Sequence, residues 1–450
     1  MSHINRMVSP LESSGLKTER GLALTVYRTL TSLARPAAGL ILRLRAQRGK
    51  EDPLRRGERL GEPAAMRPEG AVVWFHAASV GETNAVLPLI AALLARRPGL
   101  SVLFTTGTVT SARLAATRLP AGAIHQYVPL DAPEFVGRFL DHWRPALAVF
   151  IEQEIWPNLV IESDARRIPL ALVNARMSQS SFERWRRRPG FARALFSRFR
   201  IVLAQSELLA RQFAELGAPS AFAAGNLKID APPPPVDAAE LQRLEAALAG
   251  RPRLVAASTH DGEEAIVAAA HRTLARSLEG FITILAPRHP ERGAAVAEML
   301  QAQGLNVARR SLGELPDQRT DIYVADTIGE LGTLYALAPV AFVGGSLVAR
   351  GGQNPIEAIR HGAAVVTGPN WTNFADAYGA LLARGGAREV RSADALASCV
   401  LALAADPDEL DRVRTCAGEA LKSLSGALQR TLDALLVVVP GGDEGLKRAS

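Results

Sequence analysis

Two carboxylates follow runs of apolar residues that predict buried strands, and both could act as acid–base groups. Glu82 comes after the run Ala71–Ala77 and the small residues Ser79–Gly81, at the start of a predicted helix. Glu152 comes two residues after Phe150, the end of the run Ala146–Phe150. A carboxylate at the carboxyl end of a strand can face a cleft and remove a proton from a substrate. The structural alternatives are an acid that complements a helix dipole and an acid solvated at a strand end.

A glycine-rich loop in the second half of the chain could bind a phosphate. The strand-like run Ala341–Gly344 leads into it, and Asn354 begins a short predicted helix. A loop almost free of side chains lets backbone N–H groups approach a ligand, and a helix N-terminus favours an anion. Pro355 suits the first helical position, and Glu357 follows the cap by three residues, so Asn354 and Glu357 could equally be a capping pair. The two interpretations are compatible. The glycines of this loop are Gly344, Gly345, Gly351 and Gly352.

Arg288 is a further candidate for anion binding. It follows the predicted strand Phe281–Leu285, and Pro287 fixes the turn before it, which suits a clamp for phosphate or carboxylate. The eight histidines show no metal-ligand spacing, and no GxxxxGK[ST] sequence occurs. We therefore expect no tight metal site, no P-loop chemistry and no bound cofactor.

These residues need a scaffold, and the apolar pattern predicts a parallel α/β fold in two halves. Strand-like runs alternate with helix-length segments before and after Pro232–Pro235, which can be neither helix nor central strand. A chain of 450 residues is also too long for one ordinary core. We expect two Rossmann-like domains that face across a cleft, the default binding site. The predicted segments are a membrane-associating segment (1–65), a first domain (66–230), a linker (231–236), a second domain (237–430) and a tail (431–450).

Composition indicates anionic partners in a reducing compartment. The formal net charge is +7 and only two cysteines occur, so no disulfide framework is possible. Aromatic residues make up 5% of the chain, and no basic–aromatic stacking surface is present, so nucleic acid is not an expected partner.

The N-terminal segment has the composition of a membrane-associated element. The apolar stretch Leu22–Leu44 is interrupted by arginines, so no uncharged run reaches the roughly 20 residues that span a bilayer. A basic cluster from Arg43 to Arg59 follows. This pattern favours a helix that lies on an anionic membrane over one that spans it. The alternative is an ordinary amphipathic helix packed on the protein.

At these positions the sequence resembles the bacterial Kdo transferases, which transfer 3-deoxy-D-manno-octulosonic acid (Kdo) from CMP-Kdo to lipid A precursors. The resemblance covers nearly the whole chain, in order and with sensible spacing. The segments that carry it are ERLG (58–61), WFHAASVGE (74–82), IEQEIWPN (151–158), NARMS (174–178), GNLKID (225–230), STHDGEE (258–264), APRHPER (286–292), ADTIGEL (325–331), FVGGSLVARGGQNPIEA (342–358) and GPNWTNF (368–374).

The resemblance implies an inverting GT-B glycosyltransferase of lipopolysaccharide biosynthesis, bound to the cytoplasmic face of the inner membrane. It implies that Glu82 is the general base and that Glu152 and Lys228 stabilise the transition state. Lys228 could also be only a structural partner of Asp230 or another acid. The residues that would hold CMP are Pro287, Arg288, Ile328, Gly329, Glu330, Asn354, Pro355, Ile356 and Glu357. The implied partners are CMP-Kdo, a lipid A precursor and anionic inner-membrane lipids.

Two departures from the family pattern bear on these assignments. Many members have GGHN where this chain has Gln353 before Asn354, and Gln can donate a hydrogen bond but cannot titrate, so we give Gln353 no catalytic role. Ile328 stands where Met is frequent, and both are apolar. The alternative functions are another GT-B transferase or an epimerase that uses a UDP-sugar, and a nucleotide-sugar-binding module without turnover. Intact Glu82, Glu152 and Lys228 argue against the module.

Overall fold

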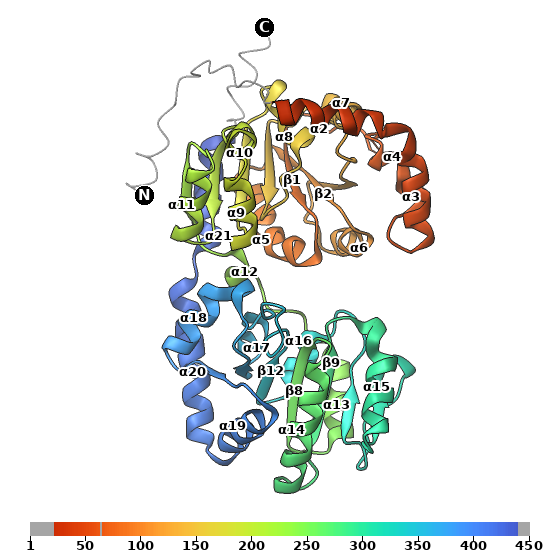
Figure 1. Cartoon of the computed structure of the whole chain (residues 1–450), viewed down its shortest axis with the longest axis vertical. Helices are drawn as coiled ribbons and strands as arrows, with labels where there is room; N and C mark the ends of the chain where they lie inside the picture. Colours follow the sequence, from red (N-terminus) through yellow and green to blue (C-terminus); the bar gives the residue numbers. More distant parts are fainter. Residues whose placement is uncertain (1–21, 64, 440–450) are drawn as a thin grey trace. The chain divides into compact units, whose positions relative to one another are not determined.

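The computed structural model describes residues 22–63 and 65–439, and it divides the chain into two compact units. The first unit extends through Ala231 and also includes the chain from Ser425, whereas the second comprises Pro232–Leu424. The division falls at the run of prolines. Each unit contains a parallel β-sheet with helices on both faces, which confirms the predicted α/β fold (Figure 1).

The sheet of the first unit is parallel throughout and has the strand order β3-β2-β1-β4-β5-β6-β7. Its strands are almost continuously apolar because both faces are covered. The order reverses between β1 and β4, so the connections that leave these neighbouring strands run in opposite directions. The strands are β1 (Ala71–Ala77), β2 (Leu100–Thr106), β3 (Ala123–Tyr127), β4 (Leu147–Ile151), β5 (Leu170–Ala175), β6 (Phe199–Ala204) and β7 (Ala221–Ala223).

Several helices of the first unit begin at a Ser or Thr N-cap soon after a strand ends, as at Ser79, Thr108 and Ser206. The helix α21 returns from the C-terminal end of the described chain and packs into the same core as β1 and α5. The sequence predicts that the second domain continues to 430 and that a tail begins at 431. In the structure the second unit ends at Leu424, and the chain from Ser425 belongs to the first unit. Residues 440–450 of that tail lie outside the described residues. The helices are α5 (Val80–Arg96), α6 (Val109–Arg118), α7 (Pro133–Trp143), α8 (Pro157–Ala165), α9 (Gln179–Arg186), α10 (Pro189–Phe196), α11 (Glu207–Glu215), α12 (Leu227–Asp230) and α21 (Ala427–Val438).

The N-terminal helix is anchored on the first unit. The hydroxyl of Tyr27 donates to Asp131 Oδ2 (2.8 Å), and Arg28 pairs with Glu162 (2.6 Å). The side chain of Leu24 is fully buried. Removing this helix would leave the partly buried Asp131 and its neighbours without these partners, so the described part of segment 1–65 is not a separable appendage.

The apolar stretch 22–44 is not one continuous helix. It is divided by the 3₁₀ turn η1 (Arg35–Ala37), whose proline cannot donate the hydrogen bond that a continuous helix requires. In the part of the chain that the structure describes, no helix has both the length and the apolar character needed to cross a bilayer. The elements here are α2 (Leu22–Leu33), η1, α3 (Ala38–Gln47), η2 (Pro53–Arg55) and α4 (Arg56–Arg59).

The sheet of the second unit is also parallel, with the order β10-β11-β9-β8-β12-β13-β14. Here the order reverses between β8 and β12. The strands are β8 (Arg253–Thr259), β9 (Ile282–Pro287), β10 (Val307–Arg309), β11 (Ile322–Val324), β12 (Val340–Val343), β13 (Ala364–Thr367) and β14 (Ala387–Glu389).

Helices and short 3₁₀ turns connect these strands and cover both faces of the sheet. The chain from Ala393 forms the helices α19 and α20, which belong to this unit. The helices are α13 (Ala238–Leu248), α14 (Glu263–Ser277), α15 (Gly293–Ala302), α16 (Leu331–Leu337), α17 (Ile356–Arg360), α18 (Ala375–Ala383), α19 (Ala393–Ala405) and α20 (Pro407–Leu424), and the 3₁₀ turns are η3 (Pro290–Arg292), η4 (Arg310–Leu312) and η5 (Thr372–Phe374).

Candidate active site

Glu82 lies in the first turn of α5, directly beyond the carboxyl end of β1. Its Oε2 accepts a hydrogen bond from the backbone N–H of Ala78 (2.7 Å), and its Oε1 accepts one from the hydroxyl of Ser79 (2.8 Å). Ser79 in turn accepts from the backbone N–H of Glu82 (3.3 Å). Ser79 is therefore the N-cap of α5, and its reciprocal pair with Glu82 fixes the carboxylate at the strand end. Capping leaves lone pairs on both oxygens that can still take a proton.

Glu152 directly follows β4, the neighbour of β1, and is buried against a lysine. Its Oε1 lies 2.5 Å from Lys228 Nζ and accepts from the side-chain amide of Asn174 (3.2 Å). Asn174 also accepts from the backbone N–H of Leu227 and so holds the start of α12, which carries the lysine. Three strand-end segments thus converge on one carboxylate.

The alternative pairing of Lys228 with Asp230 is not the ion pair that the structure shows. Asp230 instead accepts hydrogen bonds from the backbone N–H groups of Gly426 (2.9 Å) and Leu428 (2.7 Å), at the start of α21. This leaves the ammonium of Lys228 facing Glu152.

The backbone at this sheet edge is strained at two residues. Glu152 (φ 57°) and Asn174 (φ 53°) both adopt the left-handed conformation, which costs a residue other than glycine about 1–3 kcal/mol. Asparagine tolerates this region more readily than glutamate does. Strain of this kind persists where the surrounding contacts enforce it, and it is common at functional sites.

Burial and like charges raise the pKa of Glu82 above its ordinary value. Burial is the largest cause, since only 9% of the residue is exposed, and the negative charge of Glu152 adds to it. The hydrogen bonds from Ser79 and Ala78 oppose the shift, and Glu154 adds a smaller contribution in the upward direction. A carboxylate with a raised pKa binds a proton more strongly, which suits a general base.

Glu154 occupies the same strand end and has a different environment. Burial alone would raise its pKa, but His76 and Trp156 outweigh that effect and lower it. Its Oε2 accepts from the indole N–H of Trp156 (2.8 Å) and lies 3.7 Å from His76 Nε2, a separation of an ion pair rather than a hydrogen bond. The pKa of Glu154 is thus lowered, whereas that of the neighbouring Glu82 is raised.

The glycine-rich loop of the second unit does not present its backbone as predicted. The N–H groups of Gly345, Ser346 and Leu347 all donate to the carboxylate of Glu263, at 2.6, 2.9 and 2.8 Å. The N–H of Gly352 donates to the carbonyl of Gly345 (2.8 Å). The expectation that these groups bind a ligand phosphate is wrong for them, because an internal carboxylate and the loop itself already satisfy them.

The capping interpretation holds for Asn354, which accepts from a backbone N–H at the start of α17, whereas Glu357 contacts the side-chain amide of Asn354. Asn354 Oδ1 accepts from the backbone N–H of Ile356 (3.1 Å), and its amide donates to Glu357 Oε1 (3.0 Å). Pro355 is the N-cap and Ile356 begins α17. Ile356 is buried beneath this turn, so it contributes packing and a backbone group.

Pro287 and Arg288 lie at the end of β9, the neighbour of β8. Pro287 is buried and Arg288 is exposed. The backbone N–H of Arg288 donates to the carbonyl of Thr259 (2.9 Å), which ties the two strand ends together. Within residues 22–63 and 65–439, no ion pair or hydrogen bond of the Arg288 guanidinium is found. This guanidinium is therefore available to an anion.

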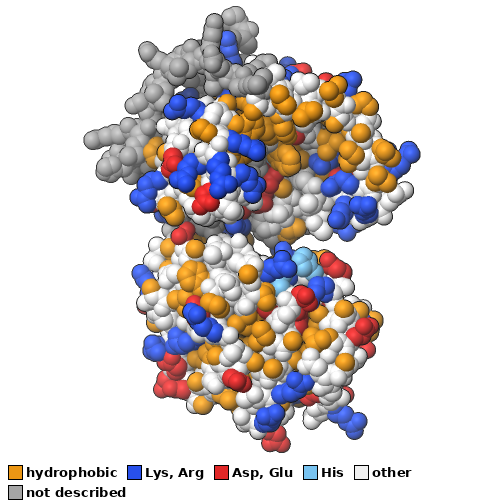
Figure 2. All heavy atoms as spheres, viewed as in Figure 1, with side chains coloured by type: hydrophobic (Ala, Val, Ile, Leu, Met, Phe, Trp, Pro, Cys, Tyr) orange, Lys and Arg blue, Asp and Glu red, His pale blue; other side chains and the backbone are white. Residues whose placement is uncertain are grey.

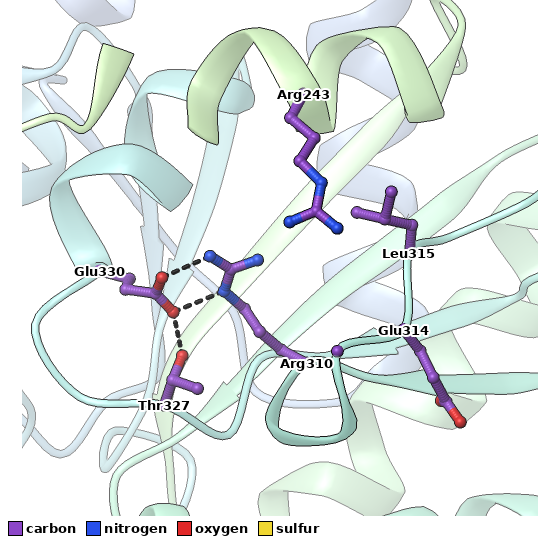
Figure 3. A pocket seen from close by; sticks show the side chains of 7 residues that line it. Arg243, Arg310, Glu314, Leu315, Thr327 and Glu330 are labelled. Atoms are coloured by element: carbon purple, nitrogen blue, oxygen red, sulfur yellow. Dashed lines mark hydrogen bonds and ion pairs between the residues drawn. The ribbon is translucent and has the colours of Figure 1, made fainter. Parts of the chain in front are cut away.

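Ile328, Gly329 and Glu330 form an exposed loop after β11, beside a pocket of about 170 Å³ (Figure 3). Ile328 is 78% exposed, and Gly329 has φ 92°, a conformation that side chains rarely adopt. Glu330 points inward and binds Arg310 and the hydroxyl of Thr327. Hydrogen bonding to Arg310 lowers the pKa of Glu330, so its carboxylate stays ionised.

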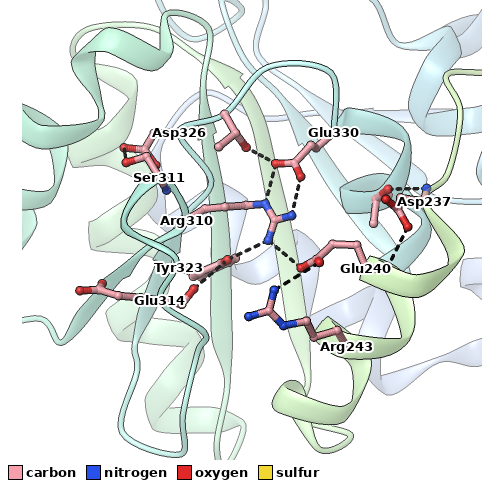
Figure 4. A network of polar contacts seen from close by, with 11 residues as sticks. Asp237, Glu240, Arg243, Arg310, Ser311, Glu314, Tyr323, Asp326 and Glu330 are labelled. Atoms are coloured by element: carbon pink, nitrogen blue, oxygen red, sulfur yellow. Dashed lines mark hydrogen bonds and ion pairs between the residues drawn. The ribbon is translucent and has the colours of Figure 1, made fainter.

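Arg310 is the centre of the polar network beside this pocket (Figure 4). Besides Glu330 it contacts Glu240 Oε1 (2.8 Å) and the hydroxyl of Tyr323 (3.3 Å). It thus joins α13, β11 and the loop 327–330. Sequence reasoning missed Arg310 and Glu263 because arginine and glutamate at loop and helix starts usually remain solvated. Glu263 lies within the family segment STHDGEE, whereas Arg310 lies in none of the family segments.

The structure therefore brings the sequence-predicted residues together in two groups. Glu82, Glu152 and Lys228 converge at the carboxyl edge of the first sheet, beside the reversal of strand order, where open α/β sheets bind ligands. The predicted nucleotide-binding residues lie beyond β9, β11 and β12, at the corresponding edge of the second sheet. Among the described residues, no group of three His, Cys, Asp or Glu side chains could hold a metal ion.

Comparison with known proteins identifies close relatives. Residues 54–231 match the family model described as 3-deoxy-D-manno-octulosonic-acid transferase (kdotransferase). A probable mitochondrial 3-deoxy-D-manno-octulosonic acid transferase of Arabidopsis thaliana is 38% identical over 78% of this chain and 80% of its own length. The 3-deoxy-D-manno-octulosonic acid transferase of Haemophilus influenzae is 36% identical over 83% of this chain and 88% of its own, and that of Rickettsia bellii is 33% identical over 92% and 98%.

Solved structures with much lower identity share the fold. A UDP-GlcNAc 2-epimerase from Neisseria meningitidis bound to UDP-GlcNAc has a TM-score of 0.56 and 13% identity, over 81% of this chain and 99% of its own. A glycosyltransferase from Rickettsia africae has a TM-score of 0.55 and 10% identity, over 85% and 100%. At this identity the likeness concerns the fold alone.

Glu152→Gln should lower the pKa of Glu82. The substitution removes the neighbouring negative charge, including its compensation of Lys228, and both changes favour ionised Glu82. Carboxyl ¹³C NMR of the full chain labelled at glutamate measures this, with the resonance assigned by its loss in Glu82→Gln. Glu207→Gln, an exposed acid in the first turn of α11, is the matched control and should leave the pKa unchanged. An unaltered pKa of Glu82 in Glu152→Gln would show that the two acids are not coupled.

Proposed function

Since the chain belongs to the family of 3-deoxy-D-manno-octulosonic acid (Kdo) transferases, it is a glycosyltransferase that transfers Kdo, and we propose that Glu82 is its catalytic base. We further propose that CMP-Kdo is the donor, that a lipid A precursor is the acceptor, and that the two units form a GT-B enzyme. The observation that carries the assignment of Glu82 is its place: a buried carboxylate of raised pKa beside the strand-order reversal, next to the Glu152–Lys228 pair.

In this mechanism Glu82 takes the proton of an acceptor hydroxyl as that oxygen attacks the anomeric carbon of Kdo. A new carbon–oxygen bond forms while the bond from the anomeric carbon to the phosphate oxygen of CMP breaks, and CMP leaves with the electron pair. Attack opposite the leaving group inverts the anomeric centre. The sugar acquires positive charge and the phosphate negative charge in the transition state, so fixed charges at the site lower the barrier.

Glu152 and Lys228 supply such charges in a fixed geometry. Their 2.5 Å ion pair and the hydrogen bond from Asn174 hold both groups before any substrate binds. Preorganised charges need no reorganisation during the reaction, which is why they stabilise a transition state efficiently. We propose that Glu152 faces the positive charge that develops on the sugar and that Lys228 offsets the developing negative charge.

We propose that the predicted residues of the second unit bind CMP. Arg288 presents a guanidinium without an acidic partner in the described chain, which suits the phosphate. Glu330, kept ionised by Arg310, has a carboxylate that can accept hydrogen bonds from ribose hydroxyls. The turn from Asn354 to Glu357 would contact the nucleotide through the groups that its cap leaves exposed.

We propose that the N-terminal helices bind the membrane that contains the acceptor. Their outward surface, here called the α2–α3 face, combines exposed apolar side chains with exposed basic ones (Figure 2). Such a surface inserts shallowly among headgroups, and its cations attract anionic lipids, as at the cytoplasmic side of an inner membrane. The α2–α3 face consists of Val26, Leu30, Leu33, Leu40, Ile41 and Leu44 with Arg35, Arg43, Arg48 and Lys50.

Glu82→Gln should reduce Kdo transfer by about 10²–10⁴-fold, because the amide cannot accept the acceptor's proton. CMP should still bind with the affinity of the parent protein. Isothermal titration calorimetry with CMP and a transfer assay with CMP-Kdo separate these two steps. Glu207→Gln, at the start of a helix on the same sheet edge, should keep full activity. Substantial transfer by Glu82→Gln would refute its role as the base.

Replacing Leu30 and Leu33 together by Glu should weaken binding to vesicles that contain anionic phosphatidylglycerol. These side chains are 61% and 71% exposed, so the fold tolerates the change while the membrane contact loses apolar area and gains negative charge. Flotation with vesicles measures the effect, and Leu208→Glu on α11, at a residue 58% exposed, is the control. Equal flotation of the double variant and the parent would place the membrane contact elsewhere.

A further inference from the structure

We propose that Glu263 and Glu264 are positioning residues that hold the donor-binding loops in register across the second sheet. This inference rests on the proposed binding of CMP by those loops. The two acids are adjacent in the sequence, follow β8 and lie in the first turn of α14. Both are almost fully buried, at 0% and 2% exposure.

Glu263 is held entirely by backbone N–H groups. Its Oε2 accepts from His260 (2.9 Å) and Gly345 (2.6 Å), and its Oε1 accepts from Ser346 (2.9 Å) and Leu347 (2.8 Å). In the described chain no cationic side chain forms an ion pair with it. Successive N–H groups in such a turn form a concavity that binds anions. Here the anion is the protein's own carboxylate, and it joins the loop after β8 to the loop after β12.

Glu264 makes the corresponding connection on the other side of β8. Its Oε1 lies 2.6 Å from Arg292 Nη1 and accepts from the hydroxyl of Thr259 (3.2 Å). Arg292 ends η3, the turn that follows Arg288 beyond β9. Because β8 lies between β9 and β12 in the sheet, two adjacent glutamates secure the loops of both neighbours.

The loop that Glu263 holds is hydrogen-bonded to the two residues that precede Asn354. The carbonyl of Gly345 accepts from the N–H of Gly352, and the carbonyl of Gly344 accepts from that of Gln353 (3.1 Å). The loop is also closely packed, since a Cβ atom at Gly344 would lie 2.6 Å from the carbonyl oxygen of Ser258. The position of the turn that begins at Asn354 therefore depends on the carboxylate of Glu263.

Position 263 requires a carboxylate because four backbone N–H groups donate to it, two to each of its oxygens. A glutamine of the same shape offers one oxygen, and its NH₂ group then opposes two backbone N–H groups. Glu263→Gln should therefore displace the loop 344–354. Glu264→Gln should loosen Arg292, which keeps only its contact with the exposed Asp261 (3.0 Å), and with it the turn η3 that follows Arg288. Small displacements of positioning groups can cost about 10²-fold in catalysis.

The test compares Glu263→Gln and Glu264→Gln in the full chain, with Glu279→Gln, an exposed acid beyond α14, as the control. Calorimetry with CMP gives the Kd, and the transfer assay gives kcat, KM for CMP-Kdo and the pH profile. We expect each variant to raise the Kd and KM by about tenfold or more. The pH profile, which reports Glu82, should not move. A purely structural role would lower the folded fraction and leave the Kd of the folded protein unchanged, and that result would overturn the proposal.

A second set of variants keeps the proposal testable if Glu263→Gln does not fold. Glu264→Gln, Arg292→Gln and the double variant form a cycle around one ion pair. We expect both single variants to weaken CMP binding and the double variant to bind no more weakly than the weaker single one. Additive losses, or no loss, would contradict the proposal. Parent protein that fails to bind CMP would instead refute the proposed function.

Discussion

Each sheet reverses its strand order once, and open α/β sheets bind their ligands at such a reversal. At the reversal the connections that leave two adjacent parallel strands diverge to opposite faces, so the carboxyl ends of those strands remain uncovered. In the first unit the uncovered ends are those of β1 and β4, and they carry Glu82 and Glu152. In the second unit they are those of β8 and β12, which carry the glutamate pair and the glycine-rich loop.

Acids at the carboxyl edges of the two sheets are stabilised by different means; Glu152 and Glu263 are buried, whereas Glu330 is partly exposed. Glu152 has an ammonium partner, Glu263 has four backbone N–H groups, and Glu330 has the guanidinium of Arg310. Burying a charge without such partners is prohibitively costly. Glu82 differs because its two hydrogen bonds only partly offset burial and the charge of Glu152. This incomplete compensation raises its pKa, in keeping with the proposed role of Glu82 as the base.

Much of this arrangement could be predicted from the sequence. The apolar runs located β1, β4, β8 and β12 because strands buried on both faces are nearly continuously hydrophobic. Family segments pointed to Glu82, Arg288 and Asn354. The sequence could not show that Glu263 accepts hydrogen bonds from the backbone N–H groups of residues 345–347, because Glu263 and Gly345 are 82 positions apart. Nor could it show that α2 is anchored through Tyr27 and Asp131, or that α21 returns to the first unit, because such long-range contacts leave no local pattern.

The family relationship and the geometry of the first sheet edge lead to one central claim: this protein transfers Kdo from CMP-Kdo to a lipid A precursor. The most direct measurement incubates the purified full chain with CMP-Kdo generated in situ and a tetra-acylated lipid A precursor, and follows the lipid by mass spectrometry. The account predicts a lipid heavier by one or more whole Kdo units, and the number of units gives the extent of transfer. A lipid of unchanged mass, with CMP-Kdo present throughout and CMP bound by the protein, would contradict the assigned acceptor.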